Sequence, residues 1–185
     1  MEGTLEATLK IRNCHKRFPG VYALKDVPIE AYGGEVVALL GVNGAGKSTL
    51  MNVLGGVLKA DEGEILIHDK TVQIHSPNES RNHGIAFIQQ EVQLFDNLTV
   101  YENMFLVELK EHRKFKYLPI LNKKELCQKA SALLGPLGCS VDPMKKVSDL
   151  SVGEQQIVQI ARALSLGGEI LLFDEPTFSL SMKEK

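Results

Sequence analysis

The fold is decided by residues 41–49, which read Gly41-Val42-Asn43-Gly44-Ala45-Gly46-Lys47-Ser48-Thr49. Glycines at the first, fourth and sixth places let the backbone bend until successive N–H groups point at one anion. The lysine suits the β- and γ-phosphates of a nucleotide, and the hydroxyl of Ser48 suits Mg²⁺. We therefore predict that all nine residues bind the phosphates of ATP, with Mg²⁺ as the metal and Lys47 acting in catalysis as well.

The flanking sequence supports a strand–loop–helix unit around this loop. Val36–Leu40 is a short apolar and β-branched run that predicts a buried strand. Lys47–Leu58 carries apolar residues at helical spacing and predicts a buried helix. A chance match to the glycine pattern is the alternative, but the strand before and the helix after are the context that a phosphate-binding loop requires.

The composition is that of an ordinary globular domain. Its 185 residues are 44% hydrophobic and 24% charged with a net charge of −2, so no bulk attraction to nucleic acid is expected. Three widely spaced cysteines favour a reducing compartment over a disulfide framework or a zinc site. The N-terminus has no apolar signal core, and no apolar run approaches the roughly 18 residues that span a bilayer. Any role at a membrane is therefore expected to depend on docking to another protein.

A second motif lies near the C-terminus, where the apolar run Ile170–Phe173 ends in Asp174 and Glu175. In phosphate-loop enzymes a strand-end acid holds Mg²⁺, usually through water, and Asp174 fits that role. Glu175 is then placed to orient or deprotonate the attacking water. The alternative is a strand followed by a polar turn, but the loop at 41–49 favours the catalytic interpretation.

The third segment is Leu150-Ser151-Val152-Gly153-Glu154-Gln155-Gln156, which precedes apolar residues at helical spacing. Its residue types predict a helix that begins after Ser151, with the serine as the N-cap. Taken alone, the segment is interpreted most simply as a capped amphipathic helix with no further function.

In their order along the chain, these motifs resemble those of the ATP-binding cassette (ABC) ATPases over residues 10–180. The third segment is similar to the signature of that family, usually Leu-Ser-Gly-Gly-Gln, with Val152 in place of a glycine. The resemblance implies that Gln90, or its neighbour Gln89, is a catalytic residue that contacts Mg²⁺ or the attacking water. It also implies that Phe18 stacks on adenine.

Members of this family sandwich ATP between two head-to-tail cassettes. The resemblance therefore implies that Ser151, Gly153 and Gln155 contact the γ-phosphate of ATP bound to a partner cassette, a contact to which N–H groups at a helix start are suited. Residues 84–106 and 17–24 are further similar to the sugar-importer branch, for ribose, galactose or xylose, and nucleoside importers resemble it in the same stretches. This implies transmembrane permease subunits as partners, an indirect link to a solute-binding protein, no nucleic acid, and a peripheral place on the cytoplasmic face of the membrane.

The predicted fold class is α/β, with a P-loop NTPase core in which helices flank a mixed sheet. An antiparallel β part precedes it, with an edge strand at Thr4–Ile11. We expect residues 1–185 to form one nucleotide-binding domain, with its core at 1–90 and 150–185 and a helical subdomain inserted at 91–149. Within the insertion, Asn122 and Glu125 predict the capped start of a helix that ends at Gly138.

Two departures from the family pattern affect the expected activity. Ser181 stands where the family has an aspartate that aligns the two cassettes. The switch histidine would lie beyond Lys185, so we expect a truncated N-terminal cassette that binds Mg·ATP but hydrolyses it weakly. The alternatives are a soluble ABC ATPase without a transport role and a regulatory cassette that binds ATP without efficient hydrolysis.

Overall fold

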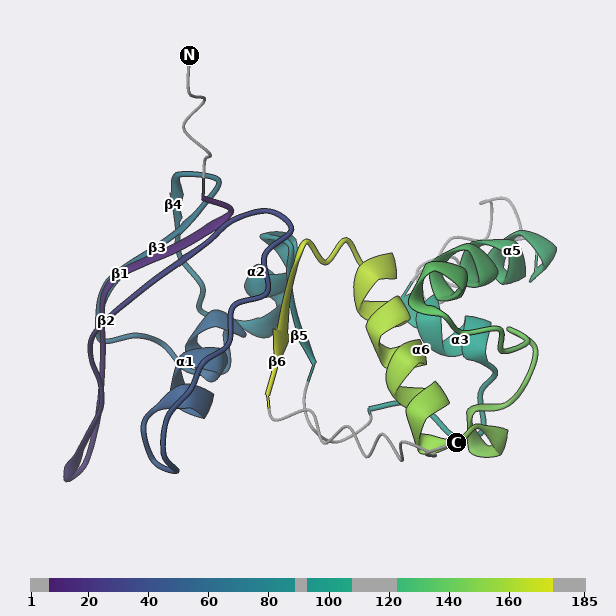
Figure 1. Ribbon diagram of the computed structural model, residues 1–185, viewed down its shortest axis with the longest axis horizontal. Coiled ribbons are helices and arrows are strands. Elements are labelled where there is room, and N and C mark those ends of the chain that lie inside the picture. Colours follow the sequence, from purple (N-terminus) through teal and green to yellow (C-terminus); the bar gives the residue numbers. More distant parts are fainter. Residues whose placement is uncertain (1–6, 89–92, 108–122, 175–185) are drawn as a thin grey trace, which may run out of the picture. The chain divides into compact units, whose positions relative to one another are not determined.

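The structure, a computed structural model, describes residues 7–88, 93–107 and 123–174 (Figure 1). The chain divides into two compact units. The described part of the first runs to Phe87 and includes Glu169–Asp174, and the described part of the second runs from Ile88 to Gly168. Each unit has its own hydrophobic core.

The first unit contains a four-stranded antiparallel sheet with the strand order β2-β1-β3-β4. Its strands are β1 (Leu9–Phe18), β2 (Val21–Ala31), β3 (Glu62–Ile67) and β4 (Lys70–Val72). The predicted edge strand at Thr4–Ile11 is wrong in its place and extent, because β1 continues to Phe18 and pairs with both β2 and β3. Leu9 and Ile11 are buried at alternate positions, so β1 contributes one face to the core.

The hairpin formed by β1 and β2 is irregular. Its register shifts between Ile11 and Arg17, and the non-glycine residues Asn13 and Asp26 have positive φ angles of 48° and 51°. The amide of Asn13 donates to the carboxylate of Asp26 at 2.8 Å, so side chains bridge the strands where the register shifts. Pro19-Gly20 closes the hairpin, with Gly20 at φ 79°.

Helix α1 (Lys47–Leu54) packs its buried Leu50, Val53 and Leu54 into the first core. We predicted a helix to Leu58, but Gly55 and Gly56 end it earlier. Gly56 has a φ of 71°, and a Cβ there would lie 2.3 Å from the carbonyl oxygen of Ser76. Ser76 is the N-cap of α2 (Pro77–Asn82). The close approach of two backbones therefore decides where α1 stops.

Strands β5 (Ile85–Ile88) and β6 (Ile170–Phe173) form a separate two-stranded sheet. The backbone N–H groups of Glu169 and Ile170 both donate to the carbonyl oxygen of Gly84, at 2.8 and 3.0 Å. The pairing joins segments that are far apart in the chain and places the end of β6 in the same unit as α1. The strand predicted by the apolar run Ile170–Phe173 is thus confirmed as β6.

The predicted buried strand at Val36–Leu40 is wrong. None of the strand pairings among the described residues includes this run, and Val36 and Leu40 are 98% and 91% exposed. A strand is stable only when its backbone N–H and C=O groups meet those of a neighbour. The apolar character of the run indicated burial but could not supply that neighbour.

The second unit is helical in its described part. Figure 1 shows α3 (Val100–Met104), α5 (Lys123–Leu134) and α6 (Val152–Ser165) packed together, and all three pairs are in contact. A short 3₁₀ turn at Gly135–Leu137 follows α5, and another at Val147–Asp149 precedes α6. The helix predicted after Asn122 is confirmed as α5, although Asn122 itself lies outside the described residues.

The compact units divide the chain differently from the predicted domains. We expected the helical subdomain to end at residue 149, with the signature helix in the core. In the structure α6 belongs to the helical unit, because its Val158 and Ala161 are fully buried with Leu126 of α5 and Val100 of α3. The single chain-wide domain therefore remains a proposal.

Substitution of Gly56 by alanine should destabilise the first unit strongly. The positive φ alone costs an L-residue about 1 kcal/mol, and the clash with the Ser76 carbonyl adds to it. Gly167→Ala is the matched control, because Gly167 has a φ of 82° but no atom within 4 Å of an added Cβ. The decrease in the thermal unfolding midpoint of Gly56→Ala should be at least about twice that of the control. Equal decreases would contradict the clash.

Candidate nucleotide site

The loop at 41–49 has the backbone geometry that its glycines predicted. Gly44 and Gly46 have φ angles of 83° and 90°, and the N–H of Ala45 donates to the carbonyl of Val42 at 3.1 Å. A Cβ on Gly46 would lie only 2.3 Å from the carbonyl oxygen of Ala23. Glycine at position 46 is therefore required both by its φ and by the closeness of β2.

The N-terminus of α1 is open to an anion. Its N-cap is Gly46, no side chain caps it, and no acidic residue occupies its first turn. The Nζ of Lys47 donates to the carbonyl oxygens of Gly41 and Val42, at 2.8 and 3.1 Å, so its ammonium lies against the loop. Phosphate oxygens would be stronger acceptors for it than these carbonyls, because they are charged. The N–H groups at this helix start and its positive end complete a phosphate-binding geometry.

The second component of the site is the end of β6. The Oγ of Ser48 donates to the Oδ1 of Asp174 at 3.2 Å, across 126 positions of sequence. Both side chains offer oxygen atoms, the ligand type that Mg²⁺ prefers, and Mg²⁺ keeps several waters and phosphate oxygens beside one or two protein ligands. The pair therefore fits the metal that the sequence predicted, and it lies beside the loop that would hold the phosphates.

Phe18 ends β1 and is 39% exposed, at the tip of the hairpin. The Nζ of Lys16 lies 5.7 Å from the centroid of its ring, and the same ammonium pairs with Asp61 at 2.7 Å. The hydrogen bond from Lys16, followed by one from the backbone N–H of Arg17, holds the pKa of Asp61 below its usual range. Phe18 is thus an exposed ring with a cation held beside it.

The predicted signature segment begins α6 with a capping box. The Oγ of Ser151 accepts a hydrogen bond from the N–H of Glu154 at 3.3 Å. The Glu154 carboxylate in turn accepts hydrogen bonds from the N–H and the Oγ of Ser151, at 2.7 and 2.8 Å. These bonds, the backbone one first, lower the pKa of Glu154. A Cβ on Gly153 would meet no atom within 4 Å. The fold of this unit therefore does not itself need glycine at 153.

Gln155 is engaged within its own unit. Its Nε2 donates to the carbonyl oxygens of Val147 and Leu150, at 3.2 and 3.3 Å, and so holds the 3₁₀ turn that precedes α6. The contact of its side chain with a partner's phosphate remains a prediction.

The structure brings together some of the predicted residues. Residues 41–49, Phe18 and Asp174 belong to the first unit, and Ser48 and Asp174 are in contact. Ser151, Gly153 and Gln155 belong to the second unit. Gln89, Gln90, Glu175 and Ser181 lie outside the described residues, so their roles stay predictions.

Sequence reasoning missed two sets of polar residues that shape these units. In the first unit, Lys16 and Asp61 flank Phe18; their pairing depends on sheet register, which no local pattern reveals.

In the second unit, the fully buried amide of Asn103 accepts a hydrogen bond from the N–H of Phe95 at 2.8 Å and donates one to the Phe95 carbonyl at 3.1 Å. Arg162 donates to the carbonyl of Gln93 at 2.9 Å. Burial would have identified Asn103 as structural, but an asparagine in a sequence carries no sign of burial.

Comparison with known proteins identifies the family. A family model described as ABC transporter matches residues 24–178. The ADP conformation of an ATP-binding cassette of an ABC transporter superposes with a TM-score of 0.78 at 32% identity, covering 95% of this chain and 71% of that one. The structure of cbiO1 from Clostridium perfringens, part of the ABC transporter complex cbiONQ, gives a TM-score of 0.77 at 29% identity, covering 95% and 68%. This chain is an ATP-binding cassette of the ABC transporter family, and the predicted fold class is confirmed.

Two curated relatives are named for sugar import. The ribose import ATP-binding protein of Clostridium perfringens (strain SM101 / Type A) is 47% identical over 173 residues, which are 94% of this chain and 34% of that protein. The arabinose import ATP-binding protein of Pseudomonas fluorescens (strain Pf0-1) is 42% identical over 183 residues, 99% of this chain and 35% of that protein. The chain thus spans about a third of the length of these relatives. Within the described residues, no helix has the length and apolar content to cross a membrane.

Replacement of Glu154 by glutamine should weaken the start of α6 in a pH-dependent way. The folded-state pKa of Glu154 is depressed, so its charge contributes stability above the unfolded pKa and loses that contribution as the pH falls. The thermal unfolding midpoint of Glu154→Gln should lie below that of the wild type at pH 7, and the gap should close below about pH 4. Glu125→Gln, in the first turn of α5, is the control. A gap of constant size across this range would rule out the charge as its cause.

Proposed function

We propose that this chain is the ATP-binding and ATP-hydrolysing part of a monosaccharide importer. The single observation that carries the proposal is the contact between Ser48 and Asp174, 3.2 Å apart beside an open, glycine-bent loop. A serine that begins a helix and an aspartate that ends a strand are the two protein ligands that P-loop NTPases give to Mg²⁺. Membership of the ABC family supports ATP as the nucleotide.

In this proposal each residue has a distinct task in phosphoryl transfer to water. The N–H groups of the loop and Lys47 orient the β- and γ-phosphates, and Ser48 and Asp174 hold the metal. Mg²⁺ supplies neutralisation of the charge that develops on the phosphate oxygens. Glu175 orients or deprotonates the water whose oxygen attacks the γ-phosphorus in line with the departing ADP, and Gln90 positions that water. Most of the acceleration comes from positioning and charge stabilisation.

The proposed active unit is a head-to-tail pair of cassettes. Ser151, Gly153 and Gln155 of one cassette would approach the γ-phosphate held by the loop of the other. Two observations support this: Ser151, Val152 and Gly153 at the N-terminus of α6 are exposed, and the space beside Gly153 is open. Closing of the pair on ATP and its parting after hydrolysis would drive a membrane permease.

The sugar cargo, the permease and a solute-binding protein enter the proposal through the relatives named for ribose and arabinose import. This function places the chain on the cytoplasmic face of the membrane as a peripheral subunit. A soluble ABC ATPase and a regulatory cassette with weak turnover are the competing outcomes. Sugar uptake by vesicles that contain the assembled transporter, with and without Glu175→Gln, separates transport from both.

Nucleotide binding directly tests the metal site that we propose at Ser48 and Asp174. Asp174→Asn should remove most of the increase in ATP affinity that Mg²⁺ produces, while it leaves binding in excess EDTA nearly unchanged. Lys47→Ala should weaken binding about tenfold or more in both conditions, because it removes a charged donor to the phosphates. Asp149→Asn, at a position in the second unit, is the control. A full Mg²⁺ effect in Asp174→Asn would exclude the proposed metal site.

Replacement of Gly153 by aspartate tests the composite site. An aspartate in the first helical turn suits the helix dipole, and the open space accepts its side chain, so the thermal midpoint should stay equal or rise slightly. Its charge would repel a partner's γ-phosphate, so ATP-dependent pairing of cassettes, measured by sedimentation in a Glu175→Gln background, should be lost. Gly135→Asp, at another open glycine of the same unit, should pair normally. Normal pairing by Gly153→Asp would refute the composite site.

A further inference from the structure

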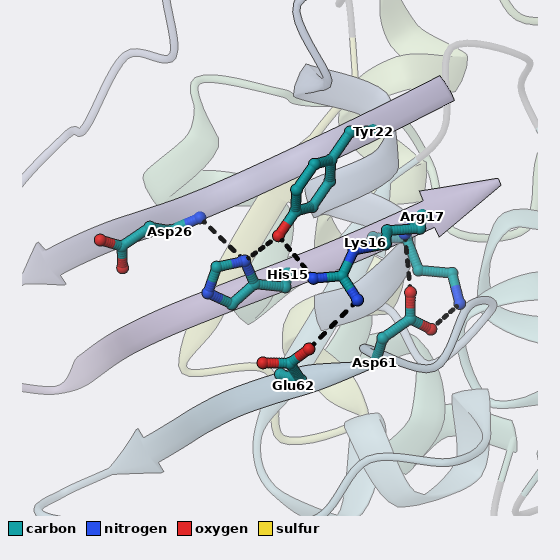
Figure 2. Close-up of polar contacts among 7 residues, drawn as sticks. All are labelled: His15, Lys16, Arg17, Tyr22, Asp26, Asp61 and Glu62. Atoms are coloured by element: carbon teal, nitrogen blue, oxygen red, sulfur yellow. Dashed lines mark hydrogen bonds and ion pairs between the residues drawn. The ribbon is translucent and has the colours of Figure 1, made fainter. Parts of the chain in front are cut away.

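A network of polar side chains crosses the β1–β2 hairpin (Figure 2). The Nδ1 of His15 lies 2.6 Å from the hydroxyl of Tyr22, which also accepts a hydrogen bond from the guanidinium of Arg17 at 3.0 Å. The backbone N–H of Asp26 donates to the same Nδ1 at 3.3 Å. The guanidinium of Arg17 pairs with Glu62 at 3.3 Å and stacks on the ring of Tyr22, 4.6 Å from its centroid.

The imidazole replaces part of the β-ladder. The register of β1 and β2 shifts on both sides of Cys14 and again at Lys16, so regular backbone pairing is interrupted around His15. At the shift, Asp26 adopts a left-handed conformation and turns its N–H to the His15 ring. A side-chain nitrogen therefore serves as the acceptor that the irregular ladder lacks.

The directions of these bonds set the protonation state of His15. The Asp26 N–H and the Arg17 guanidinium can only donate. The Nδ1 must therefore carry a lone pair. The Tyr22 hydroxyl donates its hydrogen to this lone pair, while the Tyr22 oxygen accepts a hydrogen bond from Arg17. The network requires a neutral imidazole with its proton on Nε2.

The same network fixes the end of the hairpin that carries Phe18. Arg17 pairs with Tyr22 in the register, and Phe18 pairs with Val21 next to the turn. The backbone N–H of Arg17 donates to Asp61 at 2.7 Å, so this residue is tied by both its main chain and its side chain. Position 18 follows directly, and its ring projects beside Lys16, on the face away from His15 and Arg17.

We propose that His15 is a positioning residue of the nucleotide site: its neutral imidazole holds the hairpin end so that Phe18 can stack on the base. The inference rests on the proposed function and on the resemblance to the ABC ATPases, which implies that Phe18 stacks on adenine. Protonation places a proton on Nδ1, facing a Tyr22 oxygen already bonded to Arg17, and the Asp26 N–H loses its acceptor. The hairpin end loosens and the base is held less well, while the phosphates at 41–49 are held as before.

The charged groups around His15 act in both directions. Arg17, on the same strand, opposes a second positive charge, whereas Asp26 of β2 and Glu62 of β3 favour one. Glu62 is opposite His15 in the register of β1 and β3, but its carboxylate is already paired with Arg17. Lys16 and Asp61 compensate each other, at 2.7 Å. The decisive change on protonation is therefore the lost acceptor.

The test compares ATP with inorganic tripolyphosphate, which has no base, on the full chain at about pH 8 and about pH 5.5, a range that spans the titration of imidazole. The affinity for ATP divided by the affinity for tripolyphosphate gives the contribution of the base alone. In the wild type this ratio should fall about fivefold at the lower pH, a part of what one base stack contributes. His15→Gln cannot gain a proton and keeps an acceptor, so its ratio should not change with pH. Tyr22→Phe should have the low ratio at both pH values.

Controls separate this inference from the proposed function. His75→Gln, at a histidine bonded to Gln73, should keep the pH response of the wild type. If Phe18→Ala leaves the ratio of the wild type unchanged, the proposed base site fails and this inference fails with it. If Phe18→Ala lowers the ratio but His15→Gln keeps the pH response, the base site stands and the role of His15 is overturned. The ¹⁵N resonances of His15 must also show the proton on Nε2 at about pH 8; a proton on Nδ1 would overturn the inference independently of whether the variants fold.

Discussion

The peptide at Gly46 lies so close to the carbonyl oxygen of Ala23 that an added Cβ would stand 2.3 Å from it. This approach fixes the start of α1 against β2, and with it the N–H groups that are proposed to bind a phosphate. β2 also carries Tyr22, the neighbour of Ala23, which anchors the hairpin end beside Phe18. One strand therefore relates the phosphate end of the site to its proposed base end, and both are set by packing in a single unit. The demand for glycine at 46 is steric as much as conformational.

The proposed metal end of the site depends on a different constraint. Asp174 is brought to Ser48 because β6 pairs with β5, and that pairing begins with two N–H groups that share the carbonyl of Gly84. The hydroxyl–carboxylate contact is a consequence of that pairing. An acid placed in this way is positioned by main-chain hydrogen bonds, which hold it more firmly than a flexible loop would.

The second unit shows a different use of polar groups. Asn103 is fully buried, and its side-chain amide forms hydrogen bonds with the backbone of Phe95, in the segment that precedes α3. Arg162 is partly buried, and desolvation lowers its pKa while it supports Gln93. These buried polar groups give the segment at 93–99 a defined shape, with Phe95 left 54% exposed. The unit is thereby both a packed helical core and a framework for an ordered surface loop.

The agreement between sequence and structure follows the range over which each feature is determined. The bend at 41–49, the cap at Ser151 and the helix start at Lys123 depend on residues within about one or two turns, and the sequence predicted all three. The errors at Thr4–Ile11 and Val36–Leu40 concern strands, whose stability depends on neighbours distant in the chain. The packing of α6 in the second unit has the same origin, because it depends on the partners of Val158 and Ala161.

By itself, then, the sequence determined the phosphate-binding loop, the acid at the end of β6, the capped signature helix and the family. Each of these is a short run of residue types whose chemistry is nearly independent of the rest of the fold. Only the tertiary structure decided that Ser48 meets Asp174, that Lys16 lies beside Phe18, and that the Nδ1 of His15 lies against the hydroxyl of Tyr22. The two contacts in the hairpin depend on strand register and on the left-handed residues Asn13 and Asp26, and the contact of Ser48 with Asp174 depends on the pairing of β5 with β6. A shift of one residue would turn the side chains to the opposite face, and no local pattern in the sequence specifies that register.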